Sequence, residues 1–315
     1  MNSHDSSGAR SALEQRWPAL PPGEWAEARA TLHRWLQIVG KIRMVQTPPV
    51  NHWWHTTFSI SPRGVTTAEI PAAPVAFEIE FDFIDHWLVI RCSDGNTRRM
   101  ELRPRSVADF YRELQVHMRD LSIETPIYPR PNEVADAVAF DRDERHASYD
   151  RDYVNRFWRI LVSADRAFRE FRAPFVGKCS PVHLFWGAPD LAVTRFSGRP
   201  APPHPGGIPN LPDSVTREAY SHEVSSAGFW PGGDGVEYAA FYSYAYPEPA
   251  SFAATPVRPS GAFYSKDLRE FLLPYDVVRE AEEPEALLLE FLQTTYDAAA
   301  DSGKWDRASL ERPRS

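Results

Sequence analysis

The stretch VAFEIEFDF, residues 75–83, is the part of the chain that most clearly indicates the fold class. Every second residue in it is apolar: Val75, Phe77, Ile79, Phe81 and Phe83. Acidic residues stand between them at positions 78, 80 and 82. Such alternation is typical of an antiparallel strand that has one face on the core and the other toward solvent. We therefore predict a half-buried antiparallel sheet around this stretch.

Helices and further strands surround this strand in the first half of the chain. A helical pattern opens at PPGEW, residues 21–25, and is expected to end before Pro48. Strands are expected at 52–60 and 65–70, and an Asp-Gly pair at 94–95 marks a hairpin between residues 86–92 and 97–102. Ser106 is expected to cap the helix that follows.

The second half repeats this order of elements. Asp150 is the expected cap of a long amphipathic helix, and a closing helix is expected to start at Pro284. Strand-like segments lie between these helices at 182–187, 191–196, 238–246 and 260–264. In addition, VGKIRMVQTPPVNHWW in the first half is similar to VGKCSPVHLFW in the second. We predict an α+β fold of antiparallel β-meander sheets flanked by amphipathic helices, internally duplicated, with the sheets pairing or packing about a pseudo-twofold axis and a cleft where they meet.

The pattern divides the chain into five segments. We expect a flexible N-terminus over 1–20, a first α+β half over 21–124, a linker over 125–150, a second α+β half over 151–301 and a C-terminal tail over 302–315. The second half contains a Pro/Gly-rich insertion over 197–237, which begins with SGRPAPPHPGG. Because proline stiffens a loop and glycine shapes it, we predict an ordered loop that covers one end of the second sheet.

Composition limits the classes of function. The formal net charge of −8 argues against nucleic-acid binding, which rewards a basic surface. No apolar run approaches the roughly 18 residues of a membrane span, and the N-terminus lacks the apolar segment of a secretory signal. Cys92 and Cys179 are the only cysteines, which is typical of a reducing compartment. We predict a soluble cytoplasmic protein without a nucleic-acid or membrane partner; its cofactor and oligomeric state stay open.

Polar residues suited to chemistry are concentrated in the second half. His222 and Glu223 are the candidate catalytic residues, because an imidazole and a carboxylate can act as general base and orienting group. Arg195 and Arg199 flank a turn and suit the recognition of a carboxylate or phosphate. The further candidate ligand-binding residues are His204, Trp186 and Trp230.

A structural role is the alternative for each of these residues. The arginines can equally form ion pairs, and the tryptophans can belong to the core. His222 and Glu223 are adjacent, so on a strand they face opposite ways, as His52 and His55 also would. The candidate metal ligands are His183, His204, His222 and Glu223, but their spacing specifies no site, and no metal is assigned.

Six stretches along the chain carry a resemblance to a known family: TPPVNHWWH, FEIEFDFIDH, RSVADFYREL, HASYD, FSGRPAPPHPGG and SYAYPEP. With these stretches the chain resembles an uncharacterised bacterial family, a domain of unknown function found largely in actinobacterial and proteobacterial genomes. The resemblance covers nearly the whole chain and implies one intact unit. It implies no particular reaction, because the family has no established activity.

Three hypotheses for the function follow from these observations. The first is an enzyme that acts on a small polar or anionic molecule under the 197–237 loop. The second is a non-catalytic module in which the same loop binds a ligand or a protein. The third is a metal-dependent enzyme that uses the histidines of the second half.

Overall fold

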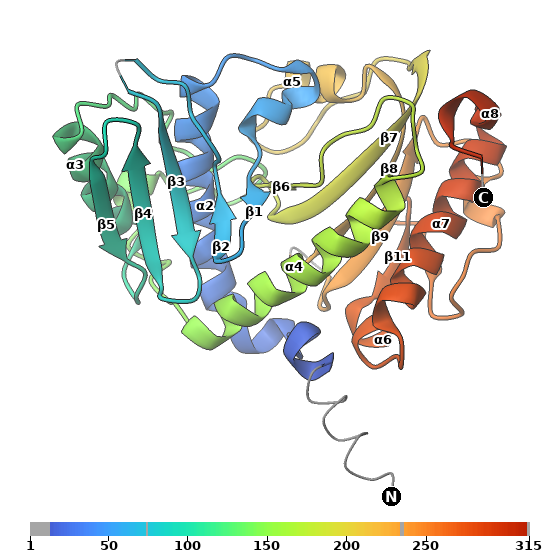
Figure 1. Cartoon of the computed structure of the whole chain (residues 1–315), viewed down its shortest axis with the longest axis horizontal. Helices are drawn as coiled ribbons and strands as arrows, with labels where there is room; N and C mark the ends of the chain where they lie inside the picture. Colours follow the sequence, from blue (N-terminus) through green and yellow to red (C-terminus); the bar gives the residue numbers. More distant parts are fainter. Residues whose placement is uncertain (1–12, 74, 234–235, 314–315) are drawn as a thin grey trace, which may run out of the picture.

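A computed structural model describes residues 13–73, 75–233 and 236–313 of the chain, which form two antiparallel sheets covered by helices (Figure 1). The α+β fold class predicted from the sequence is thereby confirmed. None of the helices in these ranges is long and apolar enough to cross a membrane.

The first sheet is a five-stranded meander. Its strands are β1 (Ser59–Ile60), β2 (Gly64–Thr66), β3 (Phe77–Asp82), β4 (Trp87–Cys92) and β5 (Thr97–Glu101), in the order β1-β2-β3-β4-β5. The apolar residues of β3 are fully buried, as their alternation predicts. Glu80 and Asp82, on the other face, are also buried, because Arg91 and Arg63 form ion pairs with them.

Two helices pack on the apolar face of this sheet. Helix η1 (Pro22–Trp25) leads into α2 (Ala26–Gln46), which ends before Pro48 as predicted. Helix α3 (Val107–Asp120) begins where the side chain of Ser106 accepts a hydrogen bond from the backbone N–H of Asp109. Trp35 of α2 stacks on Phe110 of α3, with 4.6 Å between ring centroids, and this contact locks the two helices together.

The second sheet has six strands in the order β10-β11-β9-β8-β7-β6. They are β6 (His183–Phe185), β7 (Asp190–Pro200), β8 (His222–Trp230), β9 (Ala240–Tyr246), β10 (Phe263–Ser265) and β11 (Glu270–Pro274). The long helices α4 (Arg151–Arg172) and α7 (Pro284–Ser302) pack on one face of this sheet (Figure 1). Short helical segments complete the chain: η2 (Asn51–Thr56), η3 (Phe140–Arg142), α5 (Asp213–Ala219), η4 (Phe252–Ala254), α6 (Tyr275–Arg279) and α8 (Arg307–Leu310).

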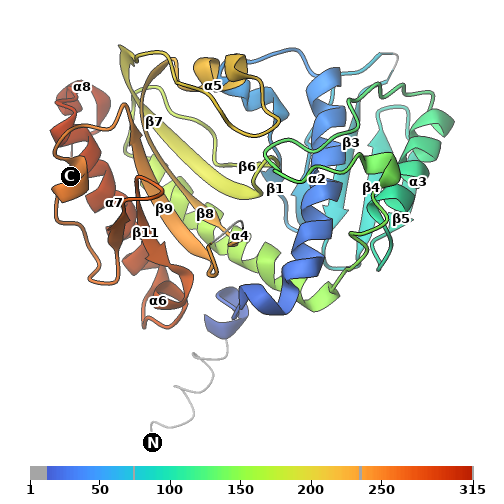
Figure 2. The same ribbon diagram turned by 180° about the vertical axis from the view of Figure 1, so that it is seen from behind.

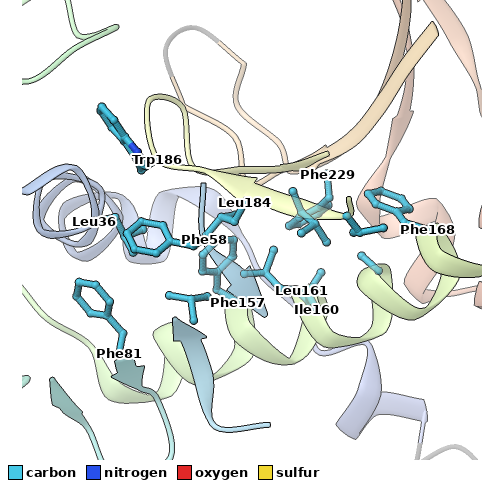
Figure 3. Close-up of a cluster of buried hydrophobic side chains, with 14 of the residues drawn as sticks. Leu36, Phe58, Phe81, Phe157, Ile160, Leu161, Phe168, Leu184, Trp186 and Phe229 are labelled. Atoms are coloured by element: carbon cyan, nitrogen blue, oxygen red, sulfur yellow. The ribbon is translucent and has the colours of Figure 1, made fainter. Parts of the chain in front are cut away.

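The two sheets join edge to edge through one β-bridge. Phe58, just before β1, and Leu184, on β6, exchange two backbone hydrogen bonds of 2.9 Å each. Phe58 and Leu184 continue into one buried apolar cluster that extends under both sheets and includes Phe81 and Phe229 (Figure 3). The internal duplication stays a prediction, as do the domain boundaries.

The predicted strand over 52–60 is wrong for most of its length. Residues 51–56 form η2, and only Ser59–Ile60 is a strand. His52 and Trp53 have left-handed backbones, with φ of 57° and 62°, which a strand cannot accommodate. The hydroxyls of Thr56 and Thr57 then bond to carbonyls three residues earlier and close the turn. This local hydrogen bonding competes successfully with the strand propensity of the aromatic residues.

Two further expectations are corrected by packing. The 197–237 insertion is not one covering loop, because residues 222–230 form β8, which pairs with β7 and β9 inside the second sheet. The N-terminus is not flexible up to residue 20, because Trp17 and Leu20 are buried and Tyr275 donates a hydrogen bond to the carbonyl of Pro18. Residues 1–12 of that segment lie outside the described ranges.

Candidate functional site

The second sheet has two faces of different character. Along β7, the odd-numbered residues Leu191, Val193 and Arg195 point toward α4 and α7. The even-numbered Asp190 and Thr194 lie on the opposite face, which Figure 2 shows from the front. The register of β7, β8 and β9 continues these two faces across the sheet.

Arg195 lies on the helix-covered face, deep in the core. Its guanidinium is 3.6 Å from the ring centroid of Phe171 and 4.2 Å from that of Tyr296, and it donates a hydrogen bond to the Phe171 carbonyl. Burial lowers the pKa of this guanidinium to about 10. The side chain is only 2% exposed, so it is placed to hold α4 and α7 on the sheet and not to bind a ligand from solvent.

Arg199 and Glu223 engage each other. The guanidinium of Arg199 donates to the Glu223 carboxylate at 2.9 and 2.6 Å and to the carbonyls of Gly303 and Lys304. Glu223 also lines a cavity of about 160 Å³ with Tyr246, Trp305 and residues of the 245–249 segment. The ion pair links the ends of β7 and β8 to the end of α7, and it satisfies the charge of both residues.

His183 and Trp186 belong to the junction between the sheets. His183 is buried, and within the described residues its one hydrogen bond, of 3.3 Å, joins Nδ1 to the hydroxyl of Thr57. Burial lowers the pKa of His183 to about 3. The indole of Trp186 donates to the Thr56 carbonyl at 2.8 Å. Both side chains are therefore fixed within the core (Figure 3 labels Trp186).

His204, His222 and Trp230 lie on the open face instead. His222 and Glu223 face opposite ways on β8, as a strand requires, so the predicted catalytic pair is not brought together. Within the described ranges, no three residues among His, Cys, Asp and Glu are grouped closely enough to hold a metal ion. The residues predicted as ligand or metal groups are thus dispersed over three parts of the structure.

A different set of side chains comes together on the open face. We call it the tyrosine–carboxyl face; its members are Glu133, Asp190, His204, Tyr220, Tyr242, Tyr244, Tyr246 and Glu270. Three of the tyrosines follow one another at every second position of β9, and two of their rings, Tyr242 and Tyr244, stack 6.0 Å apart. Strand β9 therefore presents a row of phenol groups to this face.

Tyr242 and Asp190 form the central contact of this face. Tyr242 on β9 lies over Gly228 of β8, where a Cβ atom would collide with its hydroxyl, and donates a hydrogen bond to Asp190 on β7. Next to it, the hydroxyls of Tyr220 and Tyr244 are 2.8 Å apart, as are those of Thr194 and Ser226. Hydroxyl groups thus run across three neighbouring strands.

The three carboxyls of the face are half-buried, and they lie near enough for Glu133 to repel Asp190 and Asp190 to repel Glu270. Burial raises the pKa of Asp190 to about 7, of Glu270 to about 7 and of Glu133 to about 6. Their mutual repulsion adds to the effect, because Glu133 acts on Asp190 and Asp190 acts on Glu270. Among the described residues, neither Glu133 nor Glu270 has a hydrogen-bond or ion-pair partner for its carboxyl. Groups of this kind are typical of binding sites.

Two loops border the face. The ring of His204 stacks on Tyr220 at 4.8 Å and lies 5.1 Å from Tyr246, whose hydroxyl bonds to the carbonyl of Pro202. Glu133 has a left-handed backbone, with φ of 59°, and its N–H bonds to the carbonyl of Pro209 at 2.9 Å. Residues 201–220 and the segment around residue 133 are therefore joined to each other at the border of the face.

The sequence carried only part of the signal for this face. The pattern YSYAY, residues 242–246, shows three tyrosines at alternate positions, and this alone predicts that they share one face of a strand. Asp190 follows a Gly-Ala-Pro turn at the start of a strand, a place where polar groups are common. Nothing local distinguishes Glu133 or Glu270, because their relation to Asp190 depends on contacts between segments far apart in the chain.

Comparison with known proteins gives a family without an activity. Searches of the curated proteins and of the solved structures found no match to this chain. A family model described as a family of unknown function matches residues 17–312, which include both sheets. This confirms the resemblance expected from the sequence.

Proposed function

The chain belongs to the DUF5996 family of unknown function, and we propose that it binds a small polar molecule on the tyrosine–carboxyl face. The observation that carries this proposal is the grouping of three carboxyls, two of them without a partner among the described residues, around the hydrogen bond from Tyr242 to Asp190. Half-buried carboxyls of this kind are stabilised by a ligand that supplies hydrogen-bond donors or positive charge.

The charge of the face favours an amine or a polyol over an anion. An anionic ligand was expected from Arg195 and Arg199, but one guanidinium is in the core and the other is bound to Glu223. Carboxyls with a pKa near 7 ionise readily when a cation approaches, because the cation lowers their pKa. The tyrosine rings supply apolar surface and cation–π attraction in addition.

A thermal-shift series tests this proposal directly. The wild-type protein is titrated at pH 7.5 with a linear aliphatic diamine, an amino sugar, a neutral sugar alcohol and a dicarboxylate. We expect a rise in Tm with the amines or the sugar alcohol and none with the dicarboxylate, since only the former supply donors. Asp190→Asn and Glu270→Gln should abolish the rise, whereas the exposed Glu69→Gln should leave it unchanged. A rise with the dicarboxylate alone, or a rise that survives both variants, would refute the proposal.

Acid–base catalysis on the bound molecule is the second candidate function. It is favoured by Asp190, because a carboxyl with a pKa of about 7 can exchange a proton with a bound molecule at neutral pH. Burial raises the pKa of Tyr242, so its phenol stays protonated and orients the carboxyl by a hydrogen bond. Tyr242→Phe keeps the ring and removes this hydrogen bond. If the site is catalytic, this variant should bind the ligand found above and fail to convert it; a non-catalytic module shows no conversion in the wild type either.

The cellular setting of this function is proposed to be the cytoplasm. Both cysteines are free, Cys92 buried and Cys179 half-buried, which suits a reducing compartment. Residues 201–220, which border the face, retain the role of cover that the Pro/Gly-rich composition predicts.

A further inference from the structure

Lys178 and His52 form a second polar contact on the open side of the second sheet. The Lys178 Nζ is 2.6 Å from Nε2 of His52, and Nδ1 of the same ring is 3.0 Å from the carbonyl oxygen of Ala219. Because a carbonyl only accepts, Nδ1 carries the ring proton, and Nε2 has a free lone pair that faces the lysine. The imidazole is therefore placed as the acceptor of a Lys178 proton.

The surroundings of this amine are aromatic. Its Nζ is 5.1 Å from the ring centroid of Phe196 and 5.6 Å from that of Trp54. In the part of the chain that the structure describes, no carboxylate lies within ion-pair distance of it. Burial lowers the pKa of Lys178 and also that of His52. An amine in such surroundings loses its proton more easily than one in water.

The backbone at His52 has an unfavourable conformation that the surrounding contacts must stabilise. His52 and Trp53 are consecutive residues with left-handed φ values, a conformation that costs free energy for side chains of this size. The ring of His52 is held by contacts 4.7 Å from Phe196 and 5.1 Å from Trp54, and the ring of His222 lies 6.1 Å away. Lys178 itself remains exposed, so a molecule from solvent can reach its Nζ.

We propose that Lys178 is a nucleophilic amine, with His52 as its base, that condenses with the carbonyl group of a small aldehyde or ketone. The site adjoins the tyrosine–carboxyl face, because Phe196 pairs with Val224 and Val224 pairs with Tyr246, but it shares no residue with that face. Lys178 and His52 would react without a ligand on that face, so the assignment does not depend on the function proposed above.

The reaction balances without an oxidant or a metal. The Lys178 ammonium gives one proton to Nε2 of His52, and the free amine attacks the carbonyl carbon. A C–N bond forms while the carbonyl π electrons move to oxygen. The attacking nitrogen gives one of its protons to this oxygen, which becomes a hydroxyl. The imidazolium returns its proton to the hydroxyl, which leaves as water while the nitrogen lone pair forms the C=N bond. The product is a protonated imine between Nζ and the former carbonyl carbon, together with one molecule of water.

The lysine content of the chain makes this proposal easy to test. The four lysines are Lys41, Lys178, Lys266 and Lys304, and the last two are exposed and serve as internal controls. The intact protein is treated at pH 7 with salicylaldehyde and sodium cyanoborohydride, and the modified lysines are quantified by peptide mass spectrometry. We expect Lys178 to react roughly tenfold faster than Lys266, because burial lowers the pKa of its amine and leaves more of it unprotonated at pH 7. Equal rates would overturn the proposal.

The role of His52 requires a separate comparison. His52→Gln keeps a polar side chain without the basic nitrogen and should reduce the rate at Lys178 toward that of Lys266, leaving Lys266 and Lys304 unchanged. Should this variant fail to fold, the pH dependence of labelling in the wild type decides, because the midpoint for Lys178 must fall below that for Lys266. An unchanged Lys178 rate in a folded variant, or coincident midpoints, would contradict the assignment.

Discussion

Tyr242 donates a hydrogen bond to Asp190 across a complete intervening strand. The bond spans β9 to β7 because β8 places Gly228 between them, and the phenol occupies the space that a side chain would take. One glycine thus permits the contact around which the tyrosine–carboxyl face is organised. Burial at this contact raises the pKa of Asp190 to about 7. The packing of the three strands therefore also sets the proton affinity of this carboxyl.

Gly228→Ala should break this arrangement. An added Cβ would meet the Tyr242 hydroxyl and lie 2.5 Å from the backbone oxygen of Leu191, which cannot move aside without disturbing β7. We expect a loss of about 1–3 kcal/mol in the free energy of unfolding, measured by urea denaturation, as for other overpacked sites. The ligand-induced rise in Tm should be lost as well.

A matched control is available at Gly23, where an added Cβ would meet nothing within 4 Å. Gly23→Ala should leave both stability and the ligand response close to wild type. If Gly228→Ala were as harmless as this control, the close approach of Tyr242 to β8 would not exist in solution.

The carboxyls of the same face should make stability depend on pH. Asp190 and Glu270 have folded-state pKa values of about 7, well above those of the unfolded chain. At these two carboxyls the folded protein binds more protons than the unfolded chain between about pH 4.5 and 7, so their contribution to stability falls as pH rises through this range. Asp190→Asn and Glu270→Gln should each flatten the decline and gain on the order of 2 kcal/mol at pH 8.

Urea denaturation at pH 5, 6, 7 and 8 measures this slope. Glu69→Gln, which removes an exposed carboxyl, should retain the wild-type slope. An amine ligand that neutralises the carboxyls should raise stability most at pH 8, where they repel one another fully. Equal slopes in the wild type and in both carboxyl variants would contradict this assignment of the pH dependence to Asp190 and Glu270.

Local periodicity was sufficient for much of the fold. The strand at 77–82 and the helices capped by Ser106 and Asp150 were predicted from sequence, because alternation and side-chain caps act within a few residues. The η2 turn was missed, since its two left-handed residues are His52 and Trp53, whose aromatic character favours a strand. Strand β8 was missed because its small residues, Ser225 to Gly228, are characteristic of loops until packed under tyrosines.

The candidate site was harder to predict than the fold. Arg195 and Glu223 were selected from the sequence for their charged side chains. In the structure Arg195 packs on aromatic rings, and Glu223 forms an ion pair with Arg199. The partners of charged residues are set by tertiary contacts, and these contacts cannot be read from a single sequence. By contrast, the alternating tyrosines of β9 could be assigned to one face directly from the sequence. That this face is a candidate binding site depends on Asp190 and Glu270, which come from other strands.

His183→Phe should improve stability in acid. His183 is buried with its Nε2 unpartnered among the described atoms, and its pKa of about 3 means that it stays neutral when folded. The unfolded chain protonates the imidazole near pH 6.5, so stability is lost as pH falls from there toward 3. Phenylalanine fits beside Phe185 and carries no proton, which should remove this loss.

The measurement is a comparison of urea midpoints at pH 7 and pH 5. The variant should lie within about 1 kcal/mol of wild type at pH 7, because the weak bond to Thr57 is replaced by apolar packing. At pH 5 it should be the more stable of the two. A larger loss at pH 5 than at pH 7 would mean that a charged His183 is needed for folding.

Arg195 offers the sharpest distinction between a ligand-binding and a packing role. Its guanidinium lies between Phe171 and Tyr296, and its Nε has no partner among the described atoms. Arg195→Met retains most of the volume and removes a charge that is costly to bury, so we expect a loss below about 1.5 kcal/mol. Arg195→Ala leaves a cavity between the sheet, α4 and α7, and it should lower the free energy of unfolding by about 3 kcal/mol.

Both variants should keep the amine-induced rise in Tm, because Arg195 faces away from the tyrosine–carboxyl face. If the methionine variant loses as much stability as the alanine variant, the charge itself holds the helices, through the carboxylates of Asp297 and Glu311 that attract it. If either variant folds but loses the ligand response, Arg195 takes part in binding and the two faces of the sheet are coupled.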